Sequence, residues 1–211
     1  INLDYFDYDN HSSFKLDKED IANKIFMTDK LDYIGVKQFV EKGLEFSTGG
    51  TPLEKYLSIV SYISDINKKC KDLVNELINK GKTVCSFQTR NIPHLGHERI
   101  IEEGLKHCDY LVVNPLIGVR KKGDFKTEII EKAFQFLIEN FYGNKVLYAP
   151  IIANMFYAGP REAFHHSIIR QNIGFTHFIV GRDHAGAEGI YEEDAAFKNL
   201  KGNKLNIEVI P

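Results

Sequence analysis

The sequence is short of the features that mark secreted, membrane-spanning and nucleic-acid-binding proteins. It has no tryptophan and only 3 cysteines among 211 residues. Cys70, Cys85 and Cys108 are odd in number and lack metal-ligand spacing, which favours reduced thiols in a cytoplasmic protein over a disulfide framework. No apolar run is long enough to cross a bilayer, and the opening INLDYFDYDN shows no signal-peptide pattern.

The sequence also has little excess of charge of either sign. The formal net charge is −2, so no global basic field favours a nucleic-acid partner, and any anion site must be local. The composition is otherwise that of a globular protein, with 43% hydrophobic residues and ample apolar surface for a core. The chain begins at Ile1 rather than Met and ends in LNIEVIP, a strand pattern, so we expect a piece of a longer protein.

Strand and helix patterns alternate from residue 82 onward. Apolar runs predict strands at 82–87, 110–116, 145–152 and 176–181, and the final LNIEVIP predicts a further one. Helical patterns lie between them at 98–106, 128–143 and 160–174, the last with Pro160 at its start and Gly174 at its end. Because the strands lack period-two alternation, we expect an α/β fold whose parallel sheet is covered on both faces.

The first part of the chain has a different composition. Residues 1–50 contain short apolar runs broken by Asp, Asn and Gly, and we expect a small, separately packed β-rich unit. Within it, IGVKQFVEKG has helical spacing and Gly43 is a candidate C-cap. The breaker-rich STGGTP at 47–52 precedes helical patterns at 53–66 and 70–80.

Polar clusters stand at the ends of three of the predicted strands. The clusters are QTRNIPHLGH after 82–87, PLIGVRKKGD after 110–116 and GRDHAG after 176–181. Since ligands of parallel sheets bind beyond the carboxyl ends of the strands, we expect these clusters to converge on one crevice.

These clusters have the residue types that bind oxyanions. Glycine lets backbone amides approach an anion, and a helix start directs free N–H groups at it. Arginine grips oxyanions through its fork, and histidine can donate to a phosphate oxygen. The residues suited to binding a polyphosphate and a second oxyanion are Gln88, Arg90, His94, His97, Arg182 and His184.

Each cluster by itself has a less specific explanation. His94 and His97 could be a zinc pair, although zinc needs a third ligand and no cysteine is near, or they could be helix-surface residues. PLIGVRKKGD could be a solvated basic loop and GRDHAG a tight turn. His165 and His166 are interpreted as packing and surface residues of a helix. The co-occurrence of the clusters at successive strand ends favours a common site.

The motifs resemble a known family. His94-x-Gly96-His97 at a strand-to-helix turn resembles the H-x-G-H signature of nucleotidyltransferases. FQTRNIPHLGHE, NPLIGVRKKGDF and YAGPREAFHHSIIRQNIGFTHFIVGRDHAG resemble successive motifs of the ATP sulfurylase (sulfate adenylyltransferase) family. The early stretch TDKLDYIGVKQFVEKGLEFSTGG resembles the end of that family's PUA-like N-terminal domain.

The resemblance implies a Rossmann-like catalytic domain of the H-x-G-H type at 82–211, a helical connection at 51–81 and a partial PUA-like domain at 1–50. It implies that ATP and sulfate react to give adenosine 5′-phosphosulfate and pyrophosphate, with Mg²⁺ accompanying the nucleotide. We further expect a homo-oligomer without nucleic-acid or membrane partners.

The resemblance also assigns residues to roles. Catalytic roles fall to Thr89, Arg90, Asn91, His94 and His97, the histidines stabilising the leaving pyrophosphate. ATP contacts fall to Gln88, Thr89, Arg90, Asn91, Gly181, Arg182, Asp183 and His184. Sulfate contacts fall to Gln88, Arg90 and the backbone of Ala185, and no residue is assigned as a metal ligand.

The sequence departs from the family pattern at several positions. The proline of the first motif is displaced by one, to Pro93, and Arg120 and Phe156 replace the family's Thr and Arg. The part of the fold that follows IEVIP in the family and completes the adenine pocket is not in this sequence. Two alternatives therefore stay open: a non-catalytic subunit that binds nucleotide or oxyanion, and a nucleotidyltransferase for another oxyanion.

Overall fold

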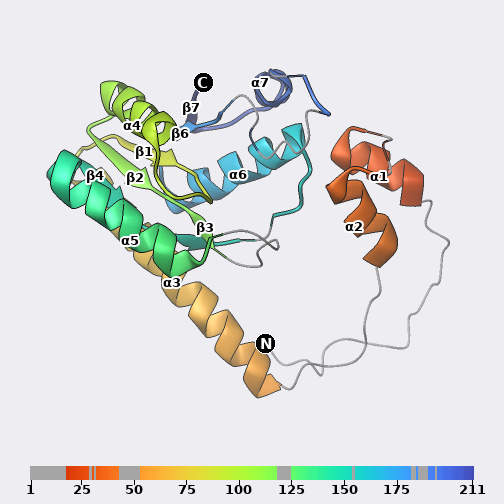
Figure 1. Cartoon of the computed structure of the whole chain (residues 1–211), viewed down its shortest axis with the longest axis horizontal. Coiled ribbons are helices and arrows are strands. Elements are labelled where there is room, and N and C mark those ends of the chain that lie inside the picture. Colours follow the sequence, from red (N-terminus) through yellow and green to blue (C-terminus); the bar gives the residue numbers. More distant parts are fainter. Residues whose placement is uncertain are drawn as a thin grey trace.

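The structure is a computed structural model that describes residues 18–28, 30, 32–42, 53–117, 125–153, 155–181, 184, 190–192 and 194–211. Its centre is a five-stranded parallel sheet (Figure 1) in the order β4-β2-β1-β6-β7. The strands are β1 (Val84–Phe87), β2 (Tyr110–Val113), β4 (Val146–Tyr148), β6 (His177–Ile179) and β7 (Glu208–Ile210). The expected α/β fold with a parallel sheet is confirmed.

The runs predicted at 110–116 and 145–152 each divide into two strands. After β2 and β4, the chain forms β3 (Leu116–Ile117) and β5 (Ile151–Ile152), which pair with each other as a separate parallel two-stranded sheet. Asn114 lies at the first break, where its backbone N–H bonds to Phe87 O at 2.8 Å. The side chain of Asn114 also donates to Ala149 O, so the two breaks are joined across the sheet end.

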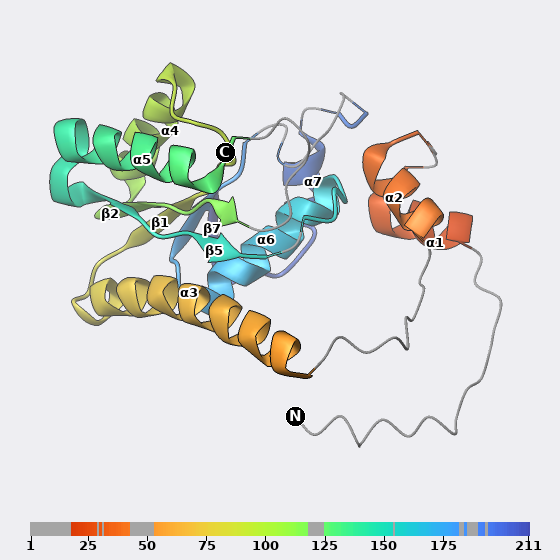
Figure 2. The ribbon, with the colours of Figure 1, turned by 60° about the horizontal axis from the view of Figure 1, so that its bottom comes forward.

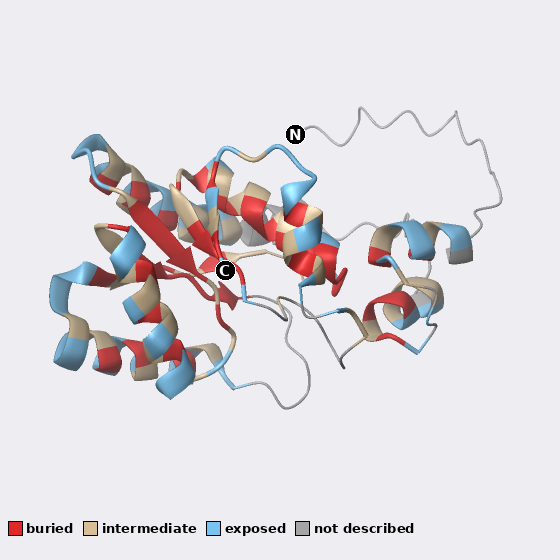
Figure 3. Cartoon of the chain, turned by 90° about the horizontal axis from the view of Figure 1, so that it is seen from above, coloured by how far each residue is buried: buried red, intermediate tan, exposed pale blue. Residues whose placement is uncertain are grey.

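Helices cover both faces of the sheet. The helices are α3 (Leu53–Asn79), α4 (Leu95–His107), α5 (Thr127–Leu137), α6 (Pro160–Ile173) and α7 (Ala195–Lys201). Successive strand residues point to opposite faces, so Val84 packs with α3 and α6 whereas Cys85 packs with α4 and α5. Figure 2 shows α4 and α5 on one side of the strands and α3 on the other, and Figure 3 shows the buried strands between them.

Local sequence signals set the helix ends next to the site. Pro160 begins α6, and Gly174, in a left-handed conformation with φ 114°, ends it by donating its N–H to Arg170 O and Gln171 O. Within α4, Gly104 permits a close approach to the sheet, because a Cβ there would lie 2.5 Å from a Leu111 methyl carbon. The helix predicted at 128–143 is α5 followed by a π-helical turn, Ile138–Tyr142.

The described part of the N-terminal segment is helical, which corrects the expectation of β structure for these residues. It forms α1 (Lys18–Phe26) and α2 (Ile34–Lys42), the second confirming the helical spacing of IGVKQFVEKG. The pair is also not packed separately, because Phe26 and Tyr33 share an apolar cluster with Tyr157 and Ala158. Residues 1–17 and 43–52 lie outside the described residues, so the PUA-like assignment stays a prediction.

The helical connection expected at 51–81 is one helix, α3, rather than two. Its Cys70 and Val74 are buried against the sheet, so α3 is a structural layer of the α/β fold. Within the described ranges, no helix is both long enough and apolar enough to span a membrane.

Candidate active site

A cavity of about 300 Å³ lies at the carboxyl ends of β1 and β6. The chain runs from β1 to β2 and β4 on one side, and then returns to β6 and β7 on the other side of β1. The cavity therefore lies at the point where the winding reverses, which is where parallel α/β sheets bind their ligands. Its lining residues are Phe87, Gln88, Thr89, Arg90, Asn91, His97, Ile100, Met155, Ile179, Gly181 and His184.

The expected meeting of the first and fourth predicted strands is confirmed by this lining. The second expected contributor is not tested, because residues 118–124 lie outside the described part of the chain; its described residues Leu116 and Ile117 belong to the separate sheet. A larger cavity of about 1020 Å³ lies between α3 and α5 and contains none of the predicted site residues.

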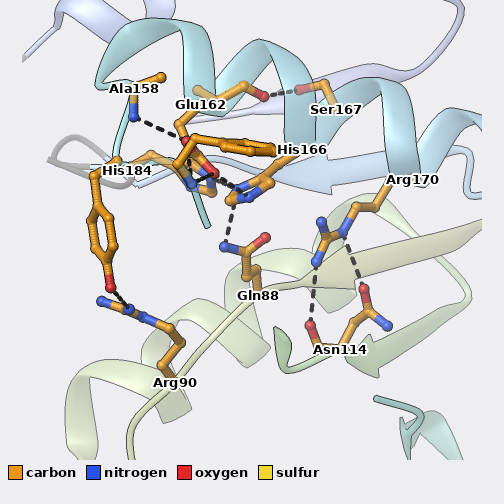
Figure 4. Close-up of polar contacts among 12 residues, drawn as sticks. Gln88, Arg90, Asn114, Ala158, Glu162, His166, Ser167, Arg170 and His184 are labelled. Carbon is orange, nitrogen blue, oxygen red and sulfur yellow. Dashed lines mark hydrogen bonds and ion pairs between the residues drawn. The ribbon is translucent and has the colours of Figure 1, made fainter. Parts of the chain in front are cut away.

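Gln88 leaves β1 toward α6, where a histidine holds it. Its Nε2 lies 3.1 Å from His166 Nδ1, and His166 Nε2 lies 3.0 Å from Glu162 Oε1 (Figure 4). Burial lowers the pKa of His166 to about 4 despite the neighbouring carboxylate, so the ring is neutral at pH 7. A carboxylate only accepts hydrogen bonds, so the proton of the neutral ring sits on Nε2 and Nδ1 is the acceptor for Gln88.

His184 approaches the same acceptor. Its Nε2 lies 2.9 Å from His166 Nδ1, and burial holds its pKa well below the usual range, so this ring is also neutral. Gln88 Nε2 and His184 Nε2 therefore both contact His166 Nδ1. The buried Oε1 of Gln88 has no hydrogen-bond partner among the described residues, so both nitrogen groups and an unpaired oxygen lie at this edge of the cavity.

Arg90 lies on the other side of Gln88 and is held by a tyrosine. Its Nη1 donates to Tyr157 Oη at 3.0 Å, and its guanidinium carbon lies 5.6 Å from the centre of the Tyr157 ring. Tyr157 has a positive φ of 54°, a conformation that costs a residue with a side chain of the order of 1–3 kcal/mol. Surrounding contacts must hold this turn in place.

The residues that open the QTRNIPHLGH motif form the floor of the cavity. Thr89 is buried, accepts the backbone N–H of Asn91 at 3.1 Å and contacts His97 Nε2 at 3.3 Å. His97 is 7% exposed, and burial followed by the nearby His94 lowers its pKa to about 4. The Nδ1 atom of His97 is buried and has no hydrogen-bond partner among the described residues.

His94 begins α4 and is exposed. Its Nδ1 accepts the Gly96 N–H at 3.1 Å, so the side chain is the N-cap of the helix. Its ring stacks on that of His97 with centres 3.8 Å apart. No third His, Cys, Asp or Glu of the described residues completes a metal-ligand group with this pair.

A buried cation lies beneath the site. Arg170, on α6, is fully buried, and burial lowers its pKa to about 9, which still leaves it charged at neutral pH. Its Nε donates to Asn114 Oδ1 at 3.1 Å and its guanidinium lies over the Phe178 ring (Figure 4). The Nη1 atom has no partner among the described residues, so this charge is only partly compensated by hydrogen bonds.

The structure thus brings together most of the residues predicted from the sequence. Those that line the cavity are Gln88, Thr89, Arg90, Asn91, His97, Gly181 and His184. His94 lies beside the cavity against His97. Arg182, Asp183 and Ala185 lie outside the described residues, as does Arg120. Phe156, where the family has arginine, is half-exposed and contacts the His165 ring edge-on.

Sequence reasoning missed the residues that hold Gln88 and Arg90. His166 is fully buried, which fits the interpretation as a packing residue and not as a surface residue, but it also contacts Gln88 at the cavity, which that interpretation left out. A signal was present: Glu162, His166 and Arg170 recur every fourth residue and so share one helix face. Tyr157 gave no such signal, because its contact with Arg90 spans 67 residues.

Comparisons with known proteins show the family of the chain. The family model described as ATP-sulfurylase matches residues 66–211. The sulfate adenylyltransferase of Ignicoccus hospitalis is 44% identical over 192 residues, which is 89% of this chain and 50% of that protein. The sulfate adenylyltransferase of Pyrococcus abyssi is 41% identical over 180 residues, 84% of this chain and 47% of that protein.

The chain therefore spans about half the length of these curated relatives. Among solved structures, a hexameric APS kinase from Thiobacillus denitrificans has a TM-score of 0.49 at 15% identity, covering 68% of this chain and 27% of its own, a similarity too low to support an argument. The match to the family model covers the sheet, the helices around it and every described residue of the cavity. The chain belongs to the ATP-sulfurylase family.

Proposed function

We propose that the protein containing this chain is a sulfate adenylyltransferase of the nucleotidyltransferase class, which converts ATP and sulfate to adenosine 5′-phosphosulfate and pyrophosphate in sulfate activation. The observation that carries the proposal is the set of nitrogen-bearing side chains that line the cavity at the ends of β1 and β6. Gln88 Nε2 and His184 Nε2 both contact His166, and Arg90 adds a guanidinium held by Tyr157. Sulfate has only acceptor oxygens, so it suits this arrangement.

Sulfate is proposed to bind Gln88, Arg90 and the backbone of Ala185. Arg90 supplies charge and a planar fork, and Gln88 supplies a neutral N–H donor. The second hydrogen of Gln88 Nε2 remains available when the first bonds to His166. Family membership and the intact Gln88-Thr89-Arg90-Asn91 sequence support this assignment.

ATP is proposed to place its phosphates over the start of α4 and beside Gly181. The proposed nucleotide contacts are Gln88, Thr89, Arg90, Asn91, Gly181, Arg182, Asp183 and His184. A Cβ at Gly181 would meet no atom within 4 Å, so the backbone there is open to a ligand. The N-terminus of α4 carries a partial positive charge that favours bound phosphate, although the Gly96 N–H is already capped by His94.

In the proposed reaction, a sulfate oxygen attacks the α-phosphorus in line and forms a new P–O bond. The bond from the α-phosphorus to the bridging oxygen breaks, and its electron pair leaves with pyrophosphate. Thr89, Arg90 and Asn91 hold the reacting groups, while His94 and His97 donate to the leaving pyrophosphate. His97 suits this role because it lines the cavity and contacts Thr89.

Mg²⁺ is proposed to arrive with ATP. In the described part of the chain, no group of three His, Cys, Asp or Glu side chains could hold an ion without the nucleotide. Such an ion would be held by phosphate oxygens and water, as Mg²⁺ commonly is in sites of this kind. It would neutralise part of the repulsion between ATP and sulfate.

The remaining features of the whole protein are also proposals. We propose a cytoplasmic homo-oligomer, an H-x-G-H type catalytic domain and a PUA-like domain that includes residues 1–50. The PUA-like assignment rests on the resemblance of residues 28–50 and receives no support from α1 and α2, which are helical. Reduced Cys70, Cys85 and Cys108, all buried thiols, support the cytoplasmic location.

The test is release of pyrophosphate by the full-length protein. We expect release that requires both ATP and sulfate, with adenosine 5′-phosphosulfate formed in equal amount. Binding of ATP or sulfate without pyrophosphate release would instead identify a non-catalytic subunit. Faster release with another tetrahedral oxyanion, such as selenate or molybdate, than with sulfate at equal concentration would identify a different second substrate.

A further inference from the structure

Glu162 is a buried carboxylate with an unusual set of partners. It lies in the first turn of α6 with no exposed surface. Its two oxygens accept the backbone N–H groups of Phe156 at 3.2 Å and Ala158 at 3.0 Å, and Oε1 lies 3.0 Å from His166 Nε2. Burial raises the pKa of Glu162, but these donors outweigh it and the net pKa is lowered, so the group is ionised.

The first connection runs from Glu162 through His166 to Gln88 (Figure 4). His166 Nε2 lies 3.0 Å from the ionised carboxylate, a distance that favours the proton on Nε2 although the two groups are not aligned as a hydrogen bond, and Nδ1 is then the acceptor. This in turn requires the amide nitrogen of Gln88 to face His166, at 3.1 Å. Glu162 therefore sets the orientation of the Gln88 amide, with Nε2 toward His166.

The second connection runs through the backbone to Arg90. The two N–H groups bound by Glu162 belong to the residues on either side of Tyr157. They stabilise the turn in which Tyr157 has its positive φ. That turn presents the hydroxyl of Tyr157 to Arg90 Nη1 at 3.0 Å.

We infer that Glu162 is a positioning residue for the oxyanion site, where it orients Gln88 through His166 and Arg90 through the turn around Tyr157. This inference rests on the proposed function, because Gln88 and Arg90 are its proposed sulfate contacts. Glu162 itself touches neither substrate. A carboxylate in the first turn also interacts favourably with the helix dipole. An exposed acid would do so equally well and would need no imidazole partner.

The deciding variant is Glu162→Gln in the full-length protein. Glutamine keeps the shape but has one acceptor oxygen and one NH₂ group. If the oxygen accepts the backbone N–H groups, the NH₂ group faces His166 Nε2 and moves the ring proton to Nδ1. Gln88 then meets a donor instead of an acceptor and turns its amide.

We expect kcat/KM for sulfate to fall on the order of 10²-fold, through misplacement of the bound oxyanion. KM for ATP should change less, because Gln88 and Arg90 are two of the three proposed sulfate contacts but share the nucleotide with six other proposed contacts. In ¹⁵N-histidine NMR, the His166 signals should change from the Nε2–H to the Nδ1–H tautomer. Ser167→Ala is the matched control: it removes a buried hydroxyl one residue from His166, whose bond to Ala163 O lies within α6.

A Glu162→Gln protein that keeps the Nε2–H tautomer and its sulfate KM, and loses only thermal stability, overturns the inference. If this variant does not fold, Tyr157→Phe tests the second connection by removing only the hydroxyl that accepts from Arg90. A raised sulfate KM supports that connection and an unchanged one refutes it. If the wild-type protein releases no pyrophosphate, the proposed function fails. The positioning role is then still tested by the His166 tautomer in NMR and by whether sulfate raises the thermal unfolding temperature less in the Glu162→Gln protein than in the wild type.

Discussion

Two histidine pairs lie beside the same cavity and are held in different ways. His166 and His184 meet edge-on, with ring planes 75° apart and nitrogens 2.9 Å apart, and His166 also contacts buried Glu162. His94 and His97 stack with ring planes 24° apart. The first pair is fixed by hydrogen bonds, whereas the second is held by stacking, a helix cap and Thr89.

The difference between the pairs fits the needs of two anions. A bound oxyanion must be oriented for attack, which favours the fixed donors around His166. A leaving pyrophosphate gains charge during the reaction, which favours a group such as His97, which lines the cavity and contacts Thr89. The substitutions below alter the two pairs separately, from the largest expected effect to the smallest.

His97→Ala should have the largest effect. In the proposed reaction this ring donates to the leaving pyrophosphate, so its loss should lower kcat and kcat/KM together by roughly 10²–10³-fold. ATP affinity should change much less. The measurement is steady-state pyrophosphate release alongside direct ATP binding. His107→Ala, an exposed histidine on the same helix, is the control. Undiminished turnover in the His97 variant would contradict the assignment.

Gln88→Glu should affect the other pair. The carboxylate has the shape of the amide but places negative charge where the sulfate dianion is proposed to bind. We expect the sulfate KM to rise on the order of 10²-fold, because juxtaposed like charges cost several kcal/mol. Gln171→Glu is the control, since its side-chain oxygen accepts the Asn206 N–H outside the cavity and a carboxylate can still do so. A rise in the KM of ATP equal to that in the KM of sulfate would contradict the placement of Gln88 chiefly at the sulfate site.

Acid should destabilise the fold through both pairs. The pKa of His97 and that of His166 are both lowered to about 4 by burial, whereas the unfolded chain has ordinary histidines. Below about pH 6.5 the unfolded state therefore binds more protons than the folded state, and the free energy of unfolding falls as pH falls toward 4. The expected slope is up to about 1.4 kcal/mol per pH unit for each histidine.

Urea unfolding between pH 7 and pH 5 measures this slope above the range in which carboxylates titrate. His97→Ala should remove the share of one histidine from the slope. A free energy of unfolding that is constant over this range would show that neither ring is protonated more readily on unfolding.

His94→Ala should have the smallest effect on the fold. The side chain caps α4 through the Gly96 N–H, and loss of a cap costs about 1 kcal/mol. His94→Asn should retain the cap and the stability, which chemical denaturation would show. If His94 also serves pyrophosphate, both variants should lose turnover. A loss of turnover in the alanine variant alone would mean that His94 acts only through the helix.

Much of this organisation follows from local sequence. The apolar runs without alternation predicted the parallel sheet, because a strand buried on both faces needs apolar residues at every position. Pro160 and Gly174 fixed the limits of α6, since proline suits the first helical position and glycine the left-handed cap. The clusters after β1 and β6 placed the site, because the carboxyl ends of neighbouring parallel strands meet.

Only the tertiary structure decided what holds the site. The contact of Gln88 with His166 joins residues 78 apart in the chain, and no local pattern specifies such a pairing. The sequence could not show that His166 is buried and neutral, since burial depends on how α6 packs on the sheet. It also gave no signal for α1, whose packing with α2 against Tyr157 stabilises a helix in a segment expected to be rich in β structure. Residue types and their order thus set the kind of chemistry, while long-range packing set the orientation and protonation of the groups that would perform it.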